Sequence, residues 1–177
     1  INDAVRRILR VKARLGLLEP AIAAQRHNNV TPSIVGQASH RELARRAVRE
    51  SLVLLKNKDA ILPLKRNLNV LVAGPGADDI GRQSGGWTLT WQGTGNTNAD
   101  FPGATSIYAG IAETVKGYGS AELSVSGAYK KRPDVAIVVI GEEPYAEGQG
   151  DRSNLNLSAA RPAELEILKS LKAQGIP

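Results

Sequence analysis

Residues 135–140 read Val-Ala-Ile-Val-Val-Ile, the strongest strand-forming run in this chain. Aliphatic residues without polar alternation are typical of a strand that is buried on both faces of a parallel sheet. A second run of this kind, Val70–Ala73, ends at the sequence Gly-Pro-Gly at residues 74–76. The two runs therefore predict central strands of one sheet.

Helical patterns separate and follow these strands. Residues 104–116 place apolar side chains on one face at helical spacing, which predicts a helix. Residues 123–125 form a weaker strand candidate, and a final helix is predicted from Pro162, a residue favoured at the first helical position, to Gly175. The order strand, helix, strand, helix predicts an α/β fold with a parallel sheet.

The start of the chain has a different character. Residues 1–18 contain a basic amphipathic helix, with Asn2 as its predicted N-cap and Gly16 as its stop, and we interpret it as the last helix of a preceding domain. Residues 19–38 have no sustained period and contain prolines and paired asparagines, which indicates a linker. The α/β domain is then predicted over residues 39–177.

Two local structures are expected at the start of this domain. Ser39 and Glu42 have the spacing of a capping box, which predicts a helix over residues 39–50. Residues 52–57 and 60–64 are mainly apolar and flank a Lys-Asp pair, which predicts two short extended segments around a turn.

Composition excludes several classes of function. The formal net charge is +6, but residues 1–66 hold 14 Lys and Arg against 5 Asp and Glu, whereas residues 67–177 hold 9 against 12. The acidic balance of the second part disfavours nucleic acid and nucleotides as partners. The absence of cysteine excludes disulfides, zinc–thiolate sites and thiol nucleophiles. No apolar run is long enough to predict a membrane span, and the first residues do not form a signal-peptide pattern.

Two tryptophans lie in a glycine-rich loop that follows the first predicted strand. Ligands of open α/β sheets bind beyond the carboxyl ends of the strands, where this loop is expected. Trp87 and Trp91 suit a flat platform for an apolar sugar face or a nucleobase, and a Trp that closes the edge of the core is the alternative. Because Arg82 is the only cation in residues 76–100, a neutral ligand is favoured over a nucleobase.

Four acidic residues follow the second predicted strand, namely Glu142, Glu143, Glu147 and Asp151. A solvated acidic surface is the simplest interpretation. Carboxylates held close together raise one another's pKa, however, and desolvation adds to that effect, which suits a general acid. Their spacing matches no EF-hand and no histidine is nearby, so neither a metal site nor a cofactor is predicted.

The sequence Gly74-Pro75-Gly76 after a strand resembles the start of a dinucleotide-binding motif. The third glycine of that motif would fall at position 79, which is Asp79. Asp78 and Asp79 would also repel a pyrophosphate, so this function is disfavoured.

Five segments resemble successive landmarks of glycoside hydrolase family 3, most closely its exo-acting β-glucosidase and glucan exohydrolase branch. They occur in the order of the family and cover nearly the whole chain. The segments are Ala4–Lys12, Arg49–Asn57, Ile61–Leu64, Gly85–Gly93 and Gly141–Asp151, of which the last two are the most specific.

This resemblance implies an enzyme of two domains. A barrel of strands and helices would carry an aspartate nucleophile, and a three-layer α/β sandwich with a mostly parallel sheet would supply the acid/base glutamate. Residues 1–18 would end the barrel domain, residues 19–38 would link the two, and residues 39–177 would form the sandwich, incomplete at its C-terminus. The nucleophile would lie outside this chain, so the chain alone is expected to be inactive.

The resemblance also assigns roles to residues. By motif position the acid/base residue is Glu147, with Glu142 as the fallback and Glu143 as a surface charge, and Trp91 would stack on the sugar in the leaving-group subsite beside Trp87. The implied reaction is retaining hydrolysis of terminal β-linked glucose from oligo- or polysaccharides, without a cofactor, in the periplasm or outside the cell. The implied partners are a β-glucoside or β-glucan and the barrel domain. A non-catalytic carbohydrate-binding α/β module is the alternative, which the four clustered acids disfavour.

Overall fold

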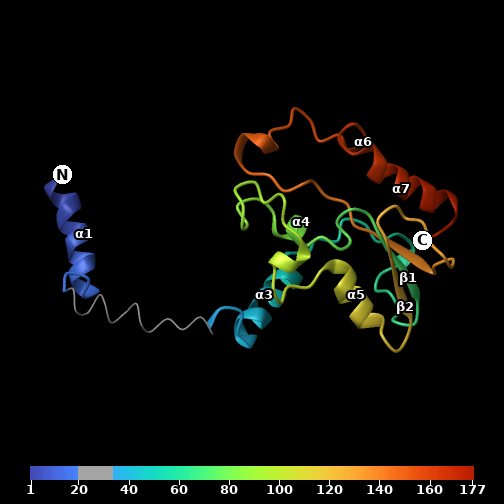
Figure 1. Ribbon diagram of the computed structural model, residues 1–177, viewed down its shortest axis with the longest axis horizontal. Helices are drawn as coiled ribbons and strands as arrows, with labels where there is room; N and C mark the ends of the chain where they lie inside the picture. The colour runs from blue at the N-terminus through green and yellow to red at the C-terminus, as the bar shows by residue number, and fades with distance from the viewer. Residues whose placement is uncertain (20–33) are drawn as a thin grey trace. The chain divides into compact units, whose positions relative to one another are not determined.

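The computed structural model describes residues 1–19 and 34–177 (Figure 1). The chain forms two compact units, Ile1–Lys56 and Asn57–Pro177, and each is described by itself. Most of the predicted linker, residues 20–33, lies outside the described residues. The domain boundaries inferred from the sequence therefore stay predictions.

The first unit begins with helix α1, Asn2–Arg14, which carries basic residues in its last turn as the helix dipole favours. The predicted N-cap is wrong, because Asn2 is already the first helical residue and Ile1 occupies the cap position. The predicted stop is confirmed: Gly16 has a φ of 67°, and the N–H of Leu17 donates to the carbonyl of Lys12 at 2.9 Å. This is the closing bond that a left-handed glycine allows at a helix end.

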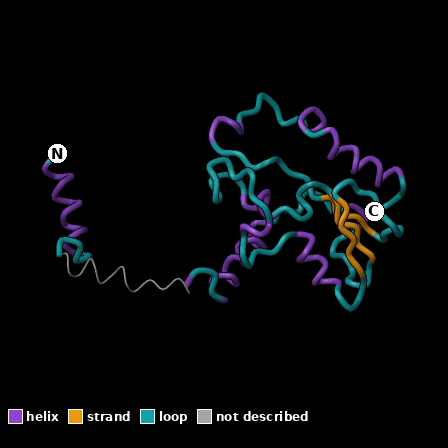
Figure 2. Tube along the Cα trace, in the orientation of Figure 1, coloured by secondary structure: helices purple, strands orange, loops and turns teal. Residues whose placement is uncertain are grey.

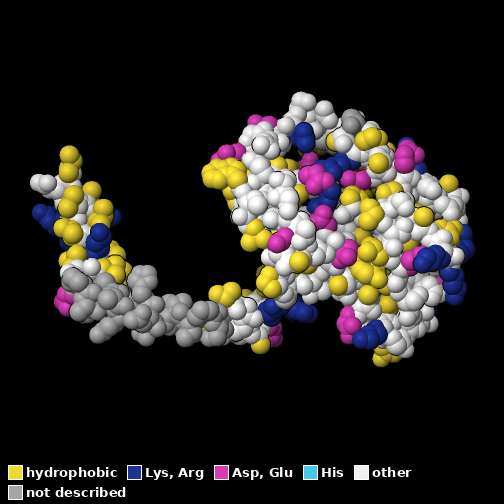
Figure 3. All heavy atoms as spheres, viewed as in Figure 1, with side chains coloured by type: hydrophobic (Ala, Val, Ile, Leu, Met, Phe, Trp, Pro, Cys, Tyr) yellow, Lys and Arg dark blue, Asp and Glu magenta, His cyan; other side chains and the backbone are white. Residues whose placement is uncertain are grey.

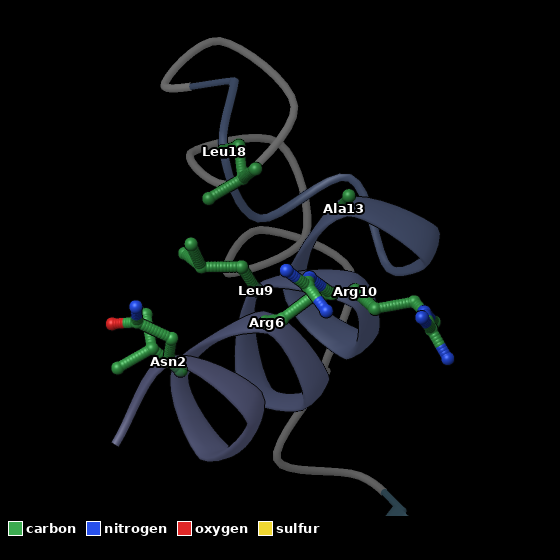
Figure 4. Close-up of a pocket in the computed structure, with 7 residues that line it drawn as sticks. Asn2, Arg6, Leu9, Arg10, Ala13 and Leu18 are labelled. Atoms are coloured by element: carbon green, nitrogen blue, oxygen red, sulfur yellow. The ribbon is translucent and has the colours of Figure 1, made fainter.

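The apolar side of α1 is exposed within its own unit. Leu9, Ala13 and Leu18 line a shallow hollow of about 550 Å³ along the helix, bordered by Asn2, Val5, Arg6 and Arg10 (Figure 4). The predicted amphipathic pattern is thus present on the helix surface, with the arginines beside the apolar strip.

Helix α3, Ala38–Ser51, starts before the predicted capping box. The carbonyl of Gln37 accepts from the N–H of Arg41 at 3.1 Å, so Gln37 is the cap and Ser39 lies inside the helix. The capping-box prediction is wrong, because a cap needs a non-helical backbone that Ser39 does not have. The Arg41 guanidinium instead donates from Nε to the carbonyl of Gly36 at 2.9 Å.

The second unit contains a parallel sheet of three strands in the order β2-β1-β3, formed by Asn69–Ala73 (β1), Ser120–Ser124 (β2) and Val135–Val138 (β3) (Figure 2). Val70 of β1 lies opposite Ala121 of β2 and Val135 of β3. All three predicted strands are confirmed. β2 begins earlier than the apolar residues suggested, because its first residue, Ser120, is polar; its hydroxyl donates to Asn69 Oδ1 of β1 at 2.8 Å.

Helices cover both faces of this sheet. Val70 and Val72 of β1 pack in a cluster with Val115 of α5, Ile107–Val115. Leu71 and Ala73, which point to the opposite face, pack with Leu171 of α7, Pro162–Ala173. This alternation along a wholly buried strand confirms the α/β sandwich with a parallel sheet, and Pro162 does begin its helix.

The predicted extended pair around residues 58 and 59 is absent from the structure. Lys58–Ala60 form a single 3₁₀ turn, and no strand is assigned on either side of it between residues 52 and 64. The side chain of Asn57 replaces the expected backbone pairing: its Oδ1 accepts from the N–H of Leu62 and its Nδ2 donates to the carbonyl of Leu62, both at 3.0 Å. One amide side chain thus makes the two bonds that a strand partner would have made.

Asp134 joins the starts of the neighbouring strands β1 and β3, and its removal is expected to lower stability in a pH-dependent manner. Its Oδ2 accepts from the backbone N–H of Asn69 at 2.7 Å and from Asn69 Nδ2 at 2.9 Å. These hydrogen bonds favour the ionised carboxylate and hold the pKa of Asp134 below its ordinary value of 3.8. The contribution to stability is therefore complete above pH 3.8 and is lost as the pH falls through the lowered pKa of the folded state.

We therefore expect Asp134→Asn to lower the melting temperature of the chain near neutral pH, with the deficit shrinking as the pH is lowered past the ordinary aspartate range. Thermal unfolding followed by circular dichroism over a pH series measures this. A deficit that stays constant with pH would show that the carboxylate charge has no part in it.

Candidate active site

Two long segments leave the sheet at the carboxyl ends of the neighbouring strands β1 and β3, and glycines let them start side by side. The N–H of Gly76 donates to the carbonyl of Val139 at 3.1 Å. A Cβ at Gly74 would lie 2.3 Å from the same carbonyl, and one at Gly76 would lie 2.9 Å from the Val139 side chain. The glycine pair is therefore explained by close backbone packing, which accounts for it without a phosphate ligand.

Arg82 ties the two segments together. It lies in the short helix α4, Ile80–Ser84, whose N-cap Asp79 accepts from the Arg82 N–H at 2.9 Å. The guanidinium donates to Asp79 Oδ2 at 3.0 Å and to the carbonyl of Gly141 at 3.0 Å, and it pairs with the carboxylate of Glu143. With 13% of its side chain exposed, Arg82 makes these contacts largely away from water. Acidic and basic side chains gather on the face of the molecule near α4 (Figure 3).

The tryptophans project from a tight backbone turn. The N–H of Trp87 donates to the carbonyl of Trp91 at 3.0 Å, and Trp87 and Leu89 adopt left-handed φ values of 55° and 61°. The exposed fractions of Trp87, Leu89 and Trp91 are 65%, 66% and 65%. The indoles therefore do not close the core; they are presented on the surface, as a stacking platform requires.

The tryptophan turn, Gly85–Gly93, packs directly on the glutamate loop, Gly141–Asp151. Gln92 Oε1 accepts from the backbone N–H of Ala146 at 2.6 Å. A Cβ at Gly86 would lie 2.0 Å from the carbonyl of Tyr145, and one at Gly93 would lie 3.0 Å from the side chain of Pro144. The two segments singled out in the sequence, far apart along the chain, are thus in backbone contact.

The acidic residues of the glutamate loop are in different environments. Glu143 is paired with Arg82. Glu142 lies 4.0 Å from the guanidinium of Arg152, and it accepts a hydrogen bond from the Tyr145 hydroxyl. That bond and the charge of Glu142 raise the pKa of Tyr145, because both favour the protonated phenol. Two of the four carboxylates are therefore engaged by other side chains.

Glu147 is exposed, and within the described part of the chain its carboxylate makes no hydrogen bond or ion pair; the same holds for Asp151. Glu147 differs from Asp151 in its backbone, because its φ of 54° lies in the left-handed region. This conformation is unfavourable for a side chain other than glycine, and such strain is concentrated at functional sites. Glu147 is thus an unpaired carboxylate held in a specific backbone geometry.

Sequence reasoning missed the roles of Arg82 and Gln92. Arg82 was visible as the only cation of residues 76–100, among three aspartates, which is a signal for an ion pair. Gln92 carried no signal, because one amide in a polar loop is ordinary.

No group of His, Cys, Asp and Glu side chains that could hold a metal ion occurs among the described residues. In the same residues, no helix is long and apolar enough to cross a membrane.

Comparison with known proteins places these features in a family. Residues 52–177 match the model of the glycosyl hydrolase family 3 C-terminal domain. The whole chain is 36% identical to the lysosomal beta glucosidase of Dictyostelium discoideum, covering 23% of it, and 29% identical to the periplasmic beta-glucosidase of Salmonella typhimurium, covering 26% of it.

A solved structure agrees with these matches. The exo-1,3/1,4-beta-glucanase of a Pseudoalteromonas species is 52% identical and superposes with a TM-score of 0.92, over 99% of this chain and 22% of that protein. The chain thus spans about a quarter of the length of these relatives. The resemblance inferred from the sequence is confirmed, and the chain belongs to glycosyl hydrolase family 3, whose C-terminal domain it matches over residues 52–177.

Proposed function

We propose that this chain is part of a retaining exo-acting β-glucosidase or glucan exohydrolase that removes terminal β-linked glucose from oligo- or polysaccharides. The observation that carries this proposal is the contact between the exposed tryptophan turn and the loop of the unpaired Glu147. Two relatives are named beta-glucosidases and the solved structure is named an exo-1,3/1,4-beta-glucanase, which supports the substrate class.

In this proposal Glu147 is the acid/base residue. It protonates the glycosidic oxygen as the bond to the anomeric carbon breaks, while an aspartate outside this chain attacks that carbon and forms a glycosyl ester. The ionised Glu147 then takes a proton from the water that hydrolyses the ester. Retaining chemistry needs the two carboxyl groups about 5 Å apart, so the domain that carries the aspartate must face the surface on which Glu147 lies.

The ion pairs in the loop support Glu147 over its neighbours. A general acid must give its proton to the substrate and recover it from water, so its carboxylate has to be accessible. The carboxylate of Glu143 is paired with a largely buried arginine, and that of Glu142 is engaged by Arg152 and Tyr145. Glu147 is the exposed glutamate of the loop without such a partner among the described residues.

The remaining assignments follow from the same proposal. The partners are a β-glucoside or β-glucan and the nucleophile-bearing barrel domain of the same enzyme, and no cofactor takes part. A periplasmic or secreted location is supported by the name of the Salmonella relative. A non-catalytic carbohydrate-binding module would also use the exposed tryptophans, and it differs in requiring no acid.

In the complete enzyme of which we propose this chain is a part, Trp91→Ala is expected to raise the KM for laminaribiose by about tenfold. Stacking on an indole contributes on the order of 1 kcal/mol beyond the burial of apolar area. Leu89→Ala is the matched control, since Leu89 lies on the same turn and is equally exposed. Steady-state kinetics measure both variants. An equal rise in the control, or no rise for Trp91→Ala, would remove the stacking role.

A further inference from the structure

The hydrogen bond between Gln92 and Ala146 lies immediately before the proposed proton donor. Gln92 Oε1 accepts from the Ala146 N–H at 2.6 Å, with Gln92 partly buried and Ala146 only 4% exposed. A backbone N–H in such a place needs a partner, since an unpaired buried donor is unfavourable. Gln92 supplies the partner from a segment more than fifty residues away along the chain.

The segment that carries Gln92 is itself held firmly. The next residue, Gly93, is buried, has a φ of 75°, and donates its N–H to the carbonyl of Thr90 at 3.1 Å. A Cβ at Gly93 would lie 2.2 Å from the carbonyl of Gly85, so the two ends of the tryptophan turn are in backbone contact. The backbone at Gln92, next to Trp91, is therefore held in place.

The direction of the Glu147 side chain depends on the backbone that precedes it. Ala146 is extended, with φ and ψ of −134° and 152°, and Glu147 is left-handed with a φ of 54°. The chain thus changes direction sharply at this residue. No side-chain bond to Glu147 among the described residues orients its carboxylate, so its direction is set by the backbone, where Ala146 caps the short 3₁₀ helix Glu147–Gly150.

We propose that Gln92 is a positioning residue for the general acid. It fixes the Ala146 peptide, and thereby holds the Glu147 carboxylate in a constant position relative to Trp91, on which the sugar stacks. This inference rests on the proposed function, in which Glu147 is the acid/base residue. The side-chain amide of Gln92 thus links Trp91, which holds the departing sugar, to Glu147, which protonates it.

The test uses the complete enzyme and two kinds of leaving group. Gln92→Leu removes the acceptor at similar size, whereas Gln92→Glu keeps an oxygen that can accept from the Ala146 N–H. Cellobiose needs protonation of its leaving oxygen, and 2,4-dinitrophenyl β-glucoside does not. We compare kcat/KM, which reports the first, bond-breaking step for both substrates.

Gln92→Leu is expected to lower kcat/KM for cellobiose by about tenfold and to change the dinitrophenyl substrate by less than about twofold, because only the first needs a placed acid. Gln92→Glu is expected to recover most of the loss. Equal losses on both substrates, or no loss on cellobiose, would overturn the inference. If Gln92→Leu does not fold, Gln92→Met, which also lacks the acceptor, is measured in its place.

Glu147→Gln in the same assay separates this inference from the proposed function. If Glu147→Gln is selectively slow on cellobiose and Gln92→Leu is not, only the positioning role fails. If Glu147→Gln shows no such selectivity, Glu147 is not the acid, and the positioning role of Gln92 is overturned together with the proposed function.

Discussion

Glu147→Gln is expected to lower kcat of the complete enzyme on cellobiose by about 10²–10⁴-fold, the range that general acid–base catalysis contributes. Glutamine has the same size and can occupy the same left-handed position, but it has no acidic proton to donate to the leaving oxygen. Steady-state kinetics with the purified variant measure the loss. Retained affinity for the sugar with lost turnover would also exclude the non-catalytic binding module.

Glu142→Gln is the matched control for this prediction. Glu142 is in the same loop, and its carboxylate is engaged by Arg152 and the Tyr145 hydroxyl. Its removal is therefore expected to have a much smaller effect on kcat than the removal of Glu147. If Glu142→Gln is inactive while Glu147→Gln turns over normally, the acid/base role belongs to Glu142.

Gly86→Ala is expected to lower kcat/KM of the complete enzyme by about 10²-fold, because displacement of catalytic groups by about an ångström is sufficient for such a loss. The added methyl group would lie 2.0 Å from the carbonyl of Tyr145, and both the glycine and that carbonyl belong to the backbone. No rotation of a side chain relieves this contact. The tryptophan turn and the glutamate loop must therefore separate.

Gly141→Ala separates this effect from a general cost of alanine in the site. Gly141 begins the glutamate loop, no atom lies within 4 Å of the position of its added Cβ, and it has no left-handed φ. Its replacement should leave kcat/KM close to that of the parent enzyme. Activity of Gly86→Ala at the parent level would show that the contact between the two loops is not needed in the enzyme.

The sheet could be predicted from the sequence because its central strand, β1, is buried on both faces. Apolar residues without alternation, as in Val70–Ala73, have few other places in a fold of this size. Pro162 marked a helix start for an equally local reason, since its ring fixes a helical φ. The capping box at Ser39 failed because its spacing is short and common, and the backbone of Gln37 had already begun the helix.

The assembly of the candidate site could be predicted only in part. Parallel strands bring their carboxyl ends to one edge, and the sequence analysis placed the tryptophan and glutamate loops after two such strands. The contacts that fix them could not be foreseen, because Gln92 and Ala146 are joined through one side chain and one peptide without periodicity or charge. The pairing of Asn57 with Leu62 was missed for the same reason.

The glycines at the contact between the tryptophan turn and the glutamate loop bear on how such enzymes can be re-engineered. Gly86 lies against the Tyr145 carbonyl and Gly93 against the Pro144 side chain, so the shape of each segment depends on that of the other. A graft that replaces residues 85–93 with those of a relative, in order to change the accepted sugar, must transplant residues 144–146 as well. Recombination with a crossover between β1 and β3 would combine segments whose shapes were never selected together.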